Sequence, residues 1–204
     1  MALFDHLAVA CGSLAADAPT IEALLGVPLE PGGKHAQMGT HNRLLSLGEG
    51  EYFELIAIDP EGQTPDRPRW FAMDSFDGPP AVRNWILRCD DMAETLAQAP
   101  MGTGTPVPFR RDALTWEFAL PDSGVLPFDN CAPALIAWGP GVPHPSTRLP
   151  DRGVRLVALT LSHPRASVLQ AALAPLIDDP RVTVITGAPG ISATFDTPSG
   201  RKTL

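Results

Sequence analysis

The sequence predicts an α+β fold of two tandem βαβββ modules followed by an additional C-terminal βαββ unit. Short apolar runs with strand-like composition are separated by turn residues, and 23 prolines are spread along the chain. The order strand, helix, strand, strand, strand begins near the N-terminus and starts again near residue 81. Residues 54–60 and 134–140 also share Leu-Ile-Ala and a terminal proline. These features favour a repeated supersecondary unit.

The first module is expected to span residues 1–63. Ser13 can cap a helix that runs to about Leu25 and stops at Gly26. Gly48-Glu49-Gly50 lies between two apolar runs, which is typical of a hairpin. The expected strands of this module cover residues 3–11, a short stretch within 27–38, then 41–47 and 51–58.

Residues 64–80, rich in proline and charge, are expected to be a linker before the second module, residues 81–150. Asp90-Asp91 can cap a helix over residues 92–98. Residues 151–204 are expected to form a partial third unit on the same core, which either completes the sheet or mediates a homodimer. The remaining expected strands cover 82–89, 107–110, 114–120, 134–138, 154–161, 182–186 and 191–196, with a helix over 167–177 and a turn with a solvated end at 196–201.

Composition excludes several classes of function. The chain has 204 residues, 44% of them hydrophobic and 19% charged, which is typical of a globular protein. Its net charge of -8 argues against a nucleic-acid or anionic-membrane surface. No apolar run approaches the roughly 20 residues that span a bilayer, and no signal peptide is recognisable. We therefore expect a cytoplasmic protein whose three cysteines, Cys11, Cys89 and Cys131, are small buried hydrophobic residues.

His6 and Glu54 are the first candidate site residues, because each interrupts a strongly apolar strand. A polar group in such a strand costs free energy unless it has a partner. Imidazole nitrogen and carboxylate oxygen are ligands for zinc, manganese, iron or nickel. The same pair could act without metal as a general base and its orienting carboxylate. The structural alternative for His6 is a buried histidine bonded to a backbone carbonyl or to Asp5.

Other candidate ligand-binding residues lie in the polar segment 32–43 and among the tryptophans. The segment contains His35, His41 and Asn42 beside glycines that allow close approach of a ligand. If a strand begins at His41, residues 41, 43, 45 and 47 share one face and residues 42, 44 and 46 the other. A solvated turn explains the same composition. Trp85 and Trp138 are candidates either for the core or for the aromatic wall of a pocket.

The segments Asp5-His6-Leu7, Gly32-Gly33-Lys34-His35, Gly39-Thr40-His41-Asn42 and Tyr52-Phe53-Glu54-Leu55 carry a family resemblance. They resemble the vicinal-oxygen-chelate superfamily, which includes glyoxalase I, extradiol dioxygenases and bleomycin-resistance proteins, and within it the glyoxalase-like domain family of bacterial proteins. The resemblance covers the first sixty residues well and the next eighty loosely. It implies paired βαβββ modules, each curling a mixed sheet around a cleft.

In metal-using members each module supplies two ligands, one from its first strand and one from its last. Here module one offers His6 and Glu54. Aligning residues 5–9 with 84–88, and residues 54–60 with 134–140, puts Trp85 and Ala134 at the equivalent positions, and neither side chain can bind a metal. Two protein ligands rarely hold a catalytic ion. A third could come from His35 or His41, although the superfamily pattern puts no ligand there. The sequence therefore leaves two states open, one divalent metal at His6 and Glu54 or none.

Two functions follow from the resemblance. The first is an enzyme of lyase, isomerase or dioxygenase type that converts a small oxygenated molecule in the cleft, with His6 and Glu54 as its catalytic residues. The second is a non-catalytic protein that sequesters a small molecule, as resistance proteins of this superfamily do. Stoichiometric metal would support the first, and a metal-free apolar cleft would support the second.

Overall fold

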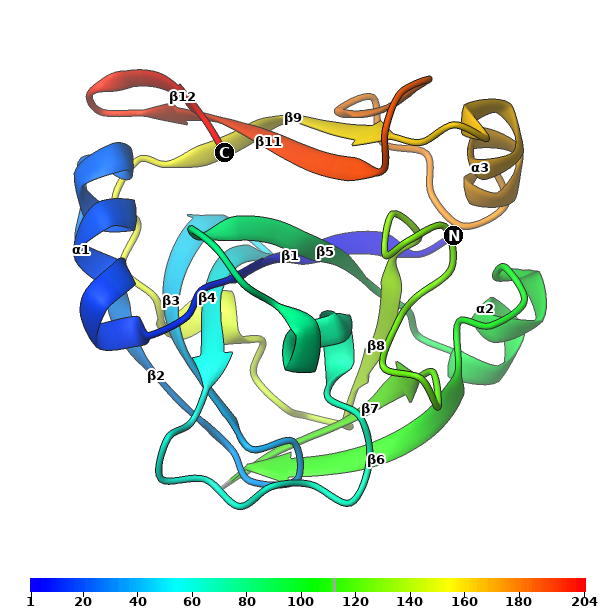
Figure 1. Ribbon diagram of the computed structural model, residues 1–204, viewed down its shortest axis with the longest axis horizontal. Coiled ribbons are helices and arrows are strands. Elements are labelled where there is room, and N and C mark those ends of the chain that lie inside the picture. Colours follow the sequence, from blue (N-terminus) through cyan, green and yellow to red (C-terminus); the bar gives the residue numbers. More distant parts are fainter. Residues whose placement is uncertain (112) are drawn as a thin grey trace.

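The computed structural model describes residues 1–111 and 113–204, and its main sheet is built from two similar modules (Figure 1). This sheet has eight strands in the order β2-β3-β4-β1-β5-β8-β7-β6. At its centre β1 (Leu3–Ala10) and β5 (Ala81–Arg88), the first strands of the two modules, pair antiparallel. Each first strand also pairs parallel with the last strand of its own module. The predicted α+β fold with tandem βαβββ modules is confirmed.

Module one forms where the local signals of the sequence place it. The Ser13 side chain accepts a hydrogen bond from the Ala16 amide at the start of the helix, and Gly26 ends the helix with a φ of 72°. That left-handed conformation strains residues with a Cβ atom, so glycine is favoured there. The elements after β1 are α1 (Leu14–Leu25), β2 (Glu30–His35), β3 (Thr40–Gly48) and β4 (Glu51–Ile58).

Module two repeats this order after β5. Asp91 caps the helix by accepting a hydrogen bond from the Glu94 amide at 2.9 Å. The two modules also match in a backbone detail, because the Cys11 amide donates to Ile56 O and the Cys89 amide donates to Ile136 O. The elements after β5 are α2 (Met92–Gln98), β6 (Thr105–Arg111), β7 (Leu114–Leu120) and β8 (Ala134–Trp138).

The sheet has a separate apolar core on each face. The outer core includes Leu7, Phe53 and Trp85, and the inner core includes Ala8 and Ile86. Alternation of side chains along the strands explains this division, because neighbouring residues point to opposite faces. All three cysteines are buried and free, as expected. Burial raises the pKa of each thiol, to about 12 for Cys11.

The segment predicted as a linker joins the modules and also folds into the inner face. It contains the 3₁₀ helix η1 (Trp70–Ser75), in which Phe71 and Ala72 have φ values of 58° and 54°. Trp70 and Phe71 are buried in the inner core with Phe109 and Phe118. Proline and charge predict a surface segment here, but the adjacent Trp-Phe pair supplies enough apolar area to bury part of it.

The C-terminal unit forms a second sheet in the order β10-β9-β11-β12, packed over the outer core. In Figure 1 it lies across the top of the view, above β1 and β5. Phe195 of this unit contacts Phe53, with ring centroids 6.0 Å apart. It does not extend the eight-stranded sheet. Its elements are β9 (Arg155–Ser162), α3 (Ala166–Leu173), β10 (Val182–Ile185), β11 (Gly190–Thr197) and β12 (Gly200–Thr203), and η2 (Pro145–Arg148) precedes them.

The last strand corrects the expected solvated end at residues 196–201. β12 pairs antiparallel with β11 through a turn after Thr197, so the unit has three strands after its helix instead of two. Its pairing also differs from that of the modules, because β9 lies between β10 and β11. The unit therefore repeats the element order of a module without its topology. Within the described residues, no helix is both long and apolar enough to span a membrane.

Candidate functional site

A pocket opens on the inner face between the two modules. Its polar lining includes His6, His35, Asn42, Glu54 and Arg111, and its apolar walls include Trp70, Trp116 and Trp138. About 470 Å³ between these side chains holds no atoms, the mouth included, and only about 40 Å³ admits the centre of a water molecule. The pocket therefore suits a small ligand.

His6 is oriented by a hydrogen bond to the preceding residue, Asp5. Its Nδ1 lies 2.6 Å from Asp5 Oδ1, and both side chains are buried. An ionised carboxylate only accepts hydrogen bonds, so Nδ1 carries the proton and donates it. The other ring nitrogen, Nε2, then has a free lone pair, and it lies 3.7 Å from Glu54 Oε2 in the pocket lining. This tautomer makes Nε2 a proton acceptor.

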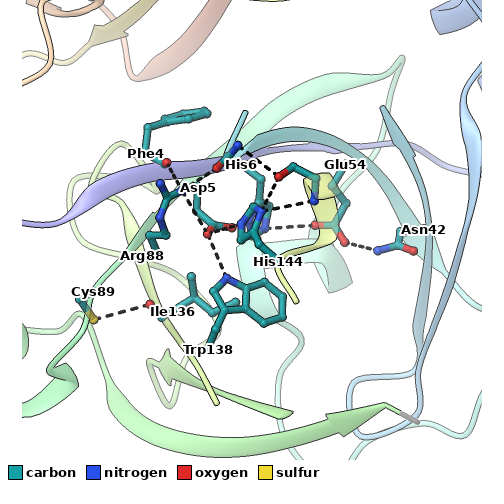
Figure 2. Close-up of polar contacts among 12 residues, drawn as sticks. Phe4, Asp5, His6, Asn42, Glu54, Arg88, Cys89, Ile136, Trp138 and His144 are labelled. Atoms are coloured by element: carbon teal, nitrogen blue, oxygen red, sulfur yellow. Dashed lines mark hydrogen bonds and ion pairs between the residues drawn. The ribbon is translucent and has the colours of Figure 1, made fainter. Parts of the chain in front are cut away.

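Asp5 is the centre of a wider network, shown in Figure 2. Its Oδ2 accepts hydrogen bonds from His144 Nε2 at 2.9 Å and from Trp138 Nε1 at 3.0 Å. The Ser146 amide donates to His144 Nδ1, so the proton of that ring is on Nε2. Burial alone would raise the pKa of Asp5, but the hydrogen bonds and charges of His144 and His6 hold it well below its usual range. Asp5 is therefore an ionised carboxylate with donors on both oxygens.

Glu54 is fixed by Asn42. Asn42 Nδ2 donates to Glu54 Oε1 at 2.6 Å, while Asn42 Oδ1 accepts from the Gly33 amide at 2.7 Å. These two bonds set the orientation of the amide group, which leaves Glu54 Oε2 directed toward His6 (Figure 2). The distance of 3.7 Å between Oε2 and Nε2 exceeds a hydrogen bond. Two fixed proton acceptors thus face each other across a gap.

His35 is buried beside this pair and is electrically neutral. Its Nδ1 lies 3.1 Å from Thr40 Oγ1, and its Nε2 lies 3.3 Å from Arg111 and 3.4 Å from Asn42 Nδ2. Desolvation by burial, together with the charge of Arg111, lowers the pKa of His35 to about 3. With Nδ1–H donating to Thr40, Nε2 accepts from the two nitrogen donors.

Tyr52 covers the face of His6. The two rings are stacked with centroids 4.3 Å apart and an interplanar angle of 13°. Burial and the charges of Asp5 and Glu54 raise the pKa of Tyr52, so its phenol keeps its proton. The stack fixes the plane of the imidazole, whose direction Asp5 already sets.

The donor set does not fit a metal ion. Among the described residues, no group of three or more His, Cys, Asp or Glu side chains is placed to hold one. The backbone match of the two modules equates Asn84 with His6, and both amide atoms of Asn84 are engaged by the backbone of Asn130, Ala132 and Ala134. The described residues of module two therefore add no ligand to His6 and Glu54. We derive no chemical step through a metal.

Of the candidate residues, the structure brings His6, Glu54, His35, Asn42 and Trp138 into one pocket. It does not bring His41 there, because His41 faces the other side of β3, beside Lys34 and Arg43. Trp85 lies on the outer face, where its Nε1 donates to Cys131 O at 2.9 Å. The alignment that equated Trp85 with His6 is wrong by one residue, and Trp85 corresponds to Leu7. A shift of one residue moves a side chain to the opposite face of a sheet.

Sequence reasoning missed Trp70, Tyr52 and Arg111 in the pocket. The sequence suggests Asp5 as a partner of His6 but does not indicate that Asp5 also binds His144 and Trp138. Tyr52 could have been found, because it is two residues before Glu54 and residues two apart in a strand share a face. No local signal identifies Trp70 or Arg111, since tertiary folding alone brings them to His35.

Two βαβββ modules around a pocket to which strands of both modules contribute side chains define a protein of the vicinal-oxygen-chelate superfamily. A family model described as a glyoxalase-like domain matches residues 4–177. The chain belongs to this glyoxalase-like family, and as such it binds or converts a small molecule. Comparison with curated proteins gave no match.

Several solved structures resemble this chain. A hypothetical protein from Staphylococcus aureus has a TM-score of 0.65 at 14% identity, covering 93% of this chain and 88% of its own. Methylmalonyl-CoA epimerase from Mycobacterium tuberculosis has a TM-score of 0.46 at 17% identity, and the match covers 68% of this chain and 88% of the epimerase. A methylmalonyl-CoA epimerase in complex with methylmalonyl-CoA and NH4+ has a TM-score of 0.47 at 15% identity, covering 71% and 99%. At 14% identity the first likeness shows the fold alone.

Proposed function

We propose that this protein is an enzyme of lyase or isomerase type that moves a proton on a small oxygenated molecule without a metal ion. One observation carries the proposal. His6 Nε2 and Glu54 Oε2 lie 3.7 Å apart in the pocket lining, and a separate side chain fixes each from behind. Two acceptors this close are stable when a donor group lies between or beside them. A ligand with an acidic C–H or O–H group meets that need.

The proton transfer itself uses His6. A C–H group next to a carbonyl gives its proton to Nε2, and the electron pair moves onto the carbonyl oxygen as an enolate. Ionised Asp5 stabilises the imidazolium that forms, because it already accepts the Nδ1 proton. Return of the proton to carbon gives an isomerase or an exchange reaction, and loss of a neighbouring group gives a lyase. The apolar walls of Trp116 and Trp138 lower the local dielectric constant and so strengthen these electrostatic effects.

Glu54 is the second acid–base group in this proposal. Asn42 holds one carboxylate oxygen and leaves the other for the ligand. Glu54 can therefore receive a ligand hydroxyl proton or return a proton to the opposite side of the reacting carbon. The scheme uses no metal, because no group of three or more His, Cys, Asp or Glu side chains among the described residues is placed to hold one, and the equivalent Asn84 is fully hydrogen-bonded.

The second candidate is a protein that sequesters its ligand without chemistry. The observation that favours it is the aromatic lining of Trp70, Trp116 and Trp138, which suits tight binding of a planar group. The two functions differ in one measurable property. An enzyme exchanges a ligand proton with solvent, whereas a sequestering protein only binds.

The test is solvent deuterium incorporation, followed by ¹H NMR, into pyruvate, 2-oxobutyrate and hydroxyacetone. We expect the protein to accelerate exchange at the carbon next to the carbonyl of at least one compound. His6→Gln should lower that rate by at least about 100-fold, because the base is removed. His41→Gln is the matched control and should keep the rate, since His41 lies on the other face of β3. Ligand binding with no exchange above the His6→Gln variant would contradict an enzyme and support sequestration.

A further inference from the structure

Arg111 is a cation in the pocket lining without an acidic partner among the described residues. It ends β6, and its Nη1 donates to His35 Nε2 at 3.3 Å. None of the ion pairs found in the described part of the chain includes it. A guanidinium carries five N–H donors in a planar fork, and neutral His35 takes one of them. The remaining donors suit two oxygens of one ligand group.

Trp70 supplies an independent sign of a missing acceptor. Its indole Nε1 is buried and, of the buried side-chain polar atoms in the described residues, it is the one without a hydrogen-bond partner. Trp70 lines the same pocket as Arg111 and contacts His35, with ring centroids 5.1 Å apart. A buried donor without a partner costs about 1–3 kcal/mol, so such groups are normally satisfied by water or ligand.

The Arg111 side chain lies close to Gly33. A Cβ atom on Gly33 would lie 2.8 Å from Arg111 Nη1 and 2.9 Å from its Cδ, so the absence of a side chain at Gly33 makes room for the arginine. Gly33 also donates its amide to Asn42, which holds Glu54. Gly33 therefore affects the positions of both Arg111 and Asn42.

Short contacts link these groups within the pocket. His6 lies 3.7 Å from Glu54, Glu54 lies 3.9 Å from His35, and His35 lies 3.3 Å from Arg111. The pocket therefore combines two proton-accepting groups with a cation that has no acidic partner among the described residues. A ligand that satisfies both carries an acidic proton for His6 or Glu54 and a negative charge for Arg111.

We propose that the ligand is a small carboxylate, bound by Arg111 and the indole N–H of Trp70, with its reacting carbon toward His6 and Glu54. The position of the reacting carbon depends on the proposed function. The anion site does not, because it is inferred from Arg111 and Trp70 alone. Two carboxylate oxygens match the fork of a guanidinium. The limited free space of the pocket restricts the ligand to a few heavy atoms beside the carboxylate.

The test compares pyruvate with pyruvamide, which has nearly the same shape but no charge, by isothermal titration calorimetry. We expect pyruvate to bind at least about tenfold more tightly than pyruvamide. Arg111→Met should weaken pyruvate at least about 30-fold and change pyruvamide less than about threefold. Trp70→Phe should weaken pyruvate by a smaller factor. The matched control is Arg43→Met, because Arg43 lies on the opposite face of β3, near Glu22.

A second variant covers the case in which Arg111→Met does not fold. Arg111→Lys keeps the charge and loses the fork, so it should weaken pyruvate by about 3-fold to 30-fold. The proposal is overturned if wild-type protein binds pyruvate no better than pyruvamide, if the foldable Arg111 variants bind pyruvate like wild type, or if phosphate binds as tightly as pyruvate.

His6→Gln separates this proposal from the proposed function. It should abolish proton exchange but keep the preference for pyruvate over pyruvamide at about tenfold or more, because it removes the base and not the cation. Arg111-dependent binding without proton exchange would support the carboxylate site and contradict the enzyme. Proton exchange that is equal for charged and neutral compounds, and unchanged in Arg111→Lys, would support the enzyme and contradict the carboxylate site.

Discussion

The indole Nε1 of Trp138 donates a hydrogen bond to Asp5 Oδ2 at 3.0 Å, although the two residues are 133 positions apart. The bond joins the last strand of module two to the first strand of module one. Asp5 in turn holds His6, so the direction of the imidazole depends on how the two modules dock. Module packing and site geometry are therefore coupled through one buried carboxylate.

Asp5→Asn should destabilise the protein by about 3 kcal/mol at neutral pH, because the amide cannot accept from His6, His144 and Trp138 as the carboxylate does. Hydrogen bonds hold the folded-state pKa of Asp5 below the ordinary value of 3.8. The folded state then favours the ionised form, and the unfolded chain binds the proton first as pH falls. The contribution of Asp5 is complete above about pH 5 and is lost as pH falls below about 4.

Urea unfolding of wild type and Asp5→Asn between pH 3 and pH 8 measures this effect. The difference in unfolding free energy should be constant at neutral pH and shrink in acid. Asp122→Asn, at an exposed position, is the control and should stay within about 0.5 kcal/mol of wild type. A difference that grows as the pH falls would contradict the assigned ionised state.

His35 should make the stability of the fold sensitive to acid at a higher pH than Asp5 does. Burial and Arg111 lower its folded-state pKa to about 3, whereas the unfolded side chain titrates near 6.5. Between these values the unfolded chain binds a proton that the folded chain does not, so stability falls as pH drops, by up to about 1.4 kcal/mol per pH unit. His35→Asn should flatten the profile between pH 6.5 and 4. His41 is the smallest of the causes that lower the pKa of His35, so His41→Asn should change the slope far less. An unchanged slope in His35→Asn would contradict the lowered pKa of His35.

Substitution of Trp85 and of Trp138 should affect different properties, stability for Trp85 and ligand binding for Trp138. Trp85→Phe loses the bond to Cys131 O and outer-core contacts, so it should cost about 1–3 kcal/mol of stability and leave ligand affinity intact. Trp138→Phe removes a donor to Asp5 and part of the pocket wall, so it should weaken ligand binding. Chemical unfolding and calorimetry of both variants measure this contrast. If only Trp85→Phe weakened ligand binding, the placement of Trp138 in the pocket and of Trp85 in the outer core would be contradicted.

Much of this fold follows from local signals in the sequence. Ser13, Gly26 and Asp91 set the helix ends, and the glycines at 48 and 50 set a hairpin, because caps and turns depend on a few neighbouring residues. His6 and Glu54 could be paired because a repeated module brings its first and last strands together.

The remaining features depend on long-range packing. A one-residue error in the repeat alignment put Trp85 on the wrong face, because the side-chain period of a strand is two. β-Bulges within the β1–β5 pair add to the difficulty of setting that register. Trp70 enters the pocket from a segment whose composition predicts solvent exposure. The cytoplasmic location and the homodimer stay predictions from the sequence.

Metal content provides a separate test. Protein purified without chelator or affinity nickel should contain far less than one divalent ion per chain, because His6 and Glu54 lack a third ligand in the described residues. Elemental analysis before and after soaking in zinc, manganese, iron and nickel measures this. Glu54→Gln is the matched variant. About one ion per chain in wild type and none in the variant would restore the metal-dependent hypothesis.

The protonation state of His6 tests the account most directly. ¹⁵N NMR of imidazole-labelled protein at pH 8, with the His6 signal assigned from His6→Gln, distinguishes the two neutral tautomers. We predict a proton on Nδ1 and a free lone pair on Nε2, with loss of this preference in Asp5→Asn. A wild-type His6 with its proton on Nε2 would leave no base directed at the ligand and would contradict the proposed proton transfer.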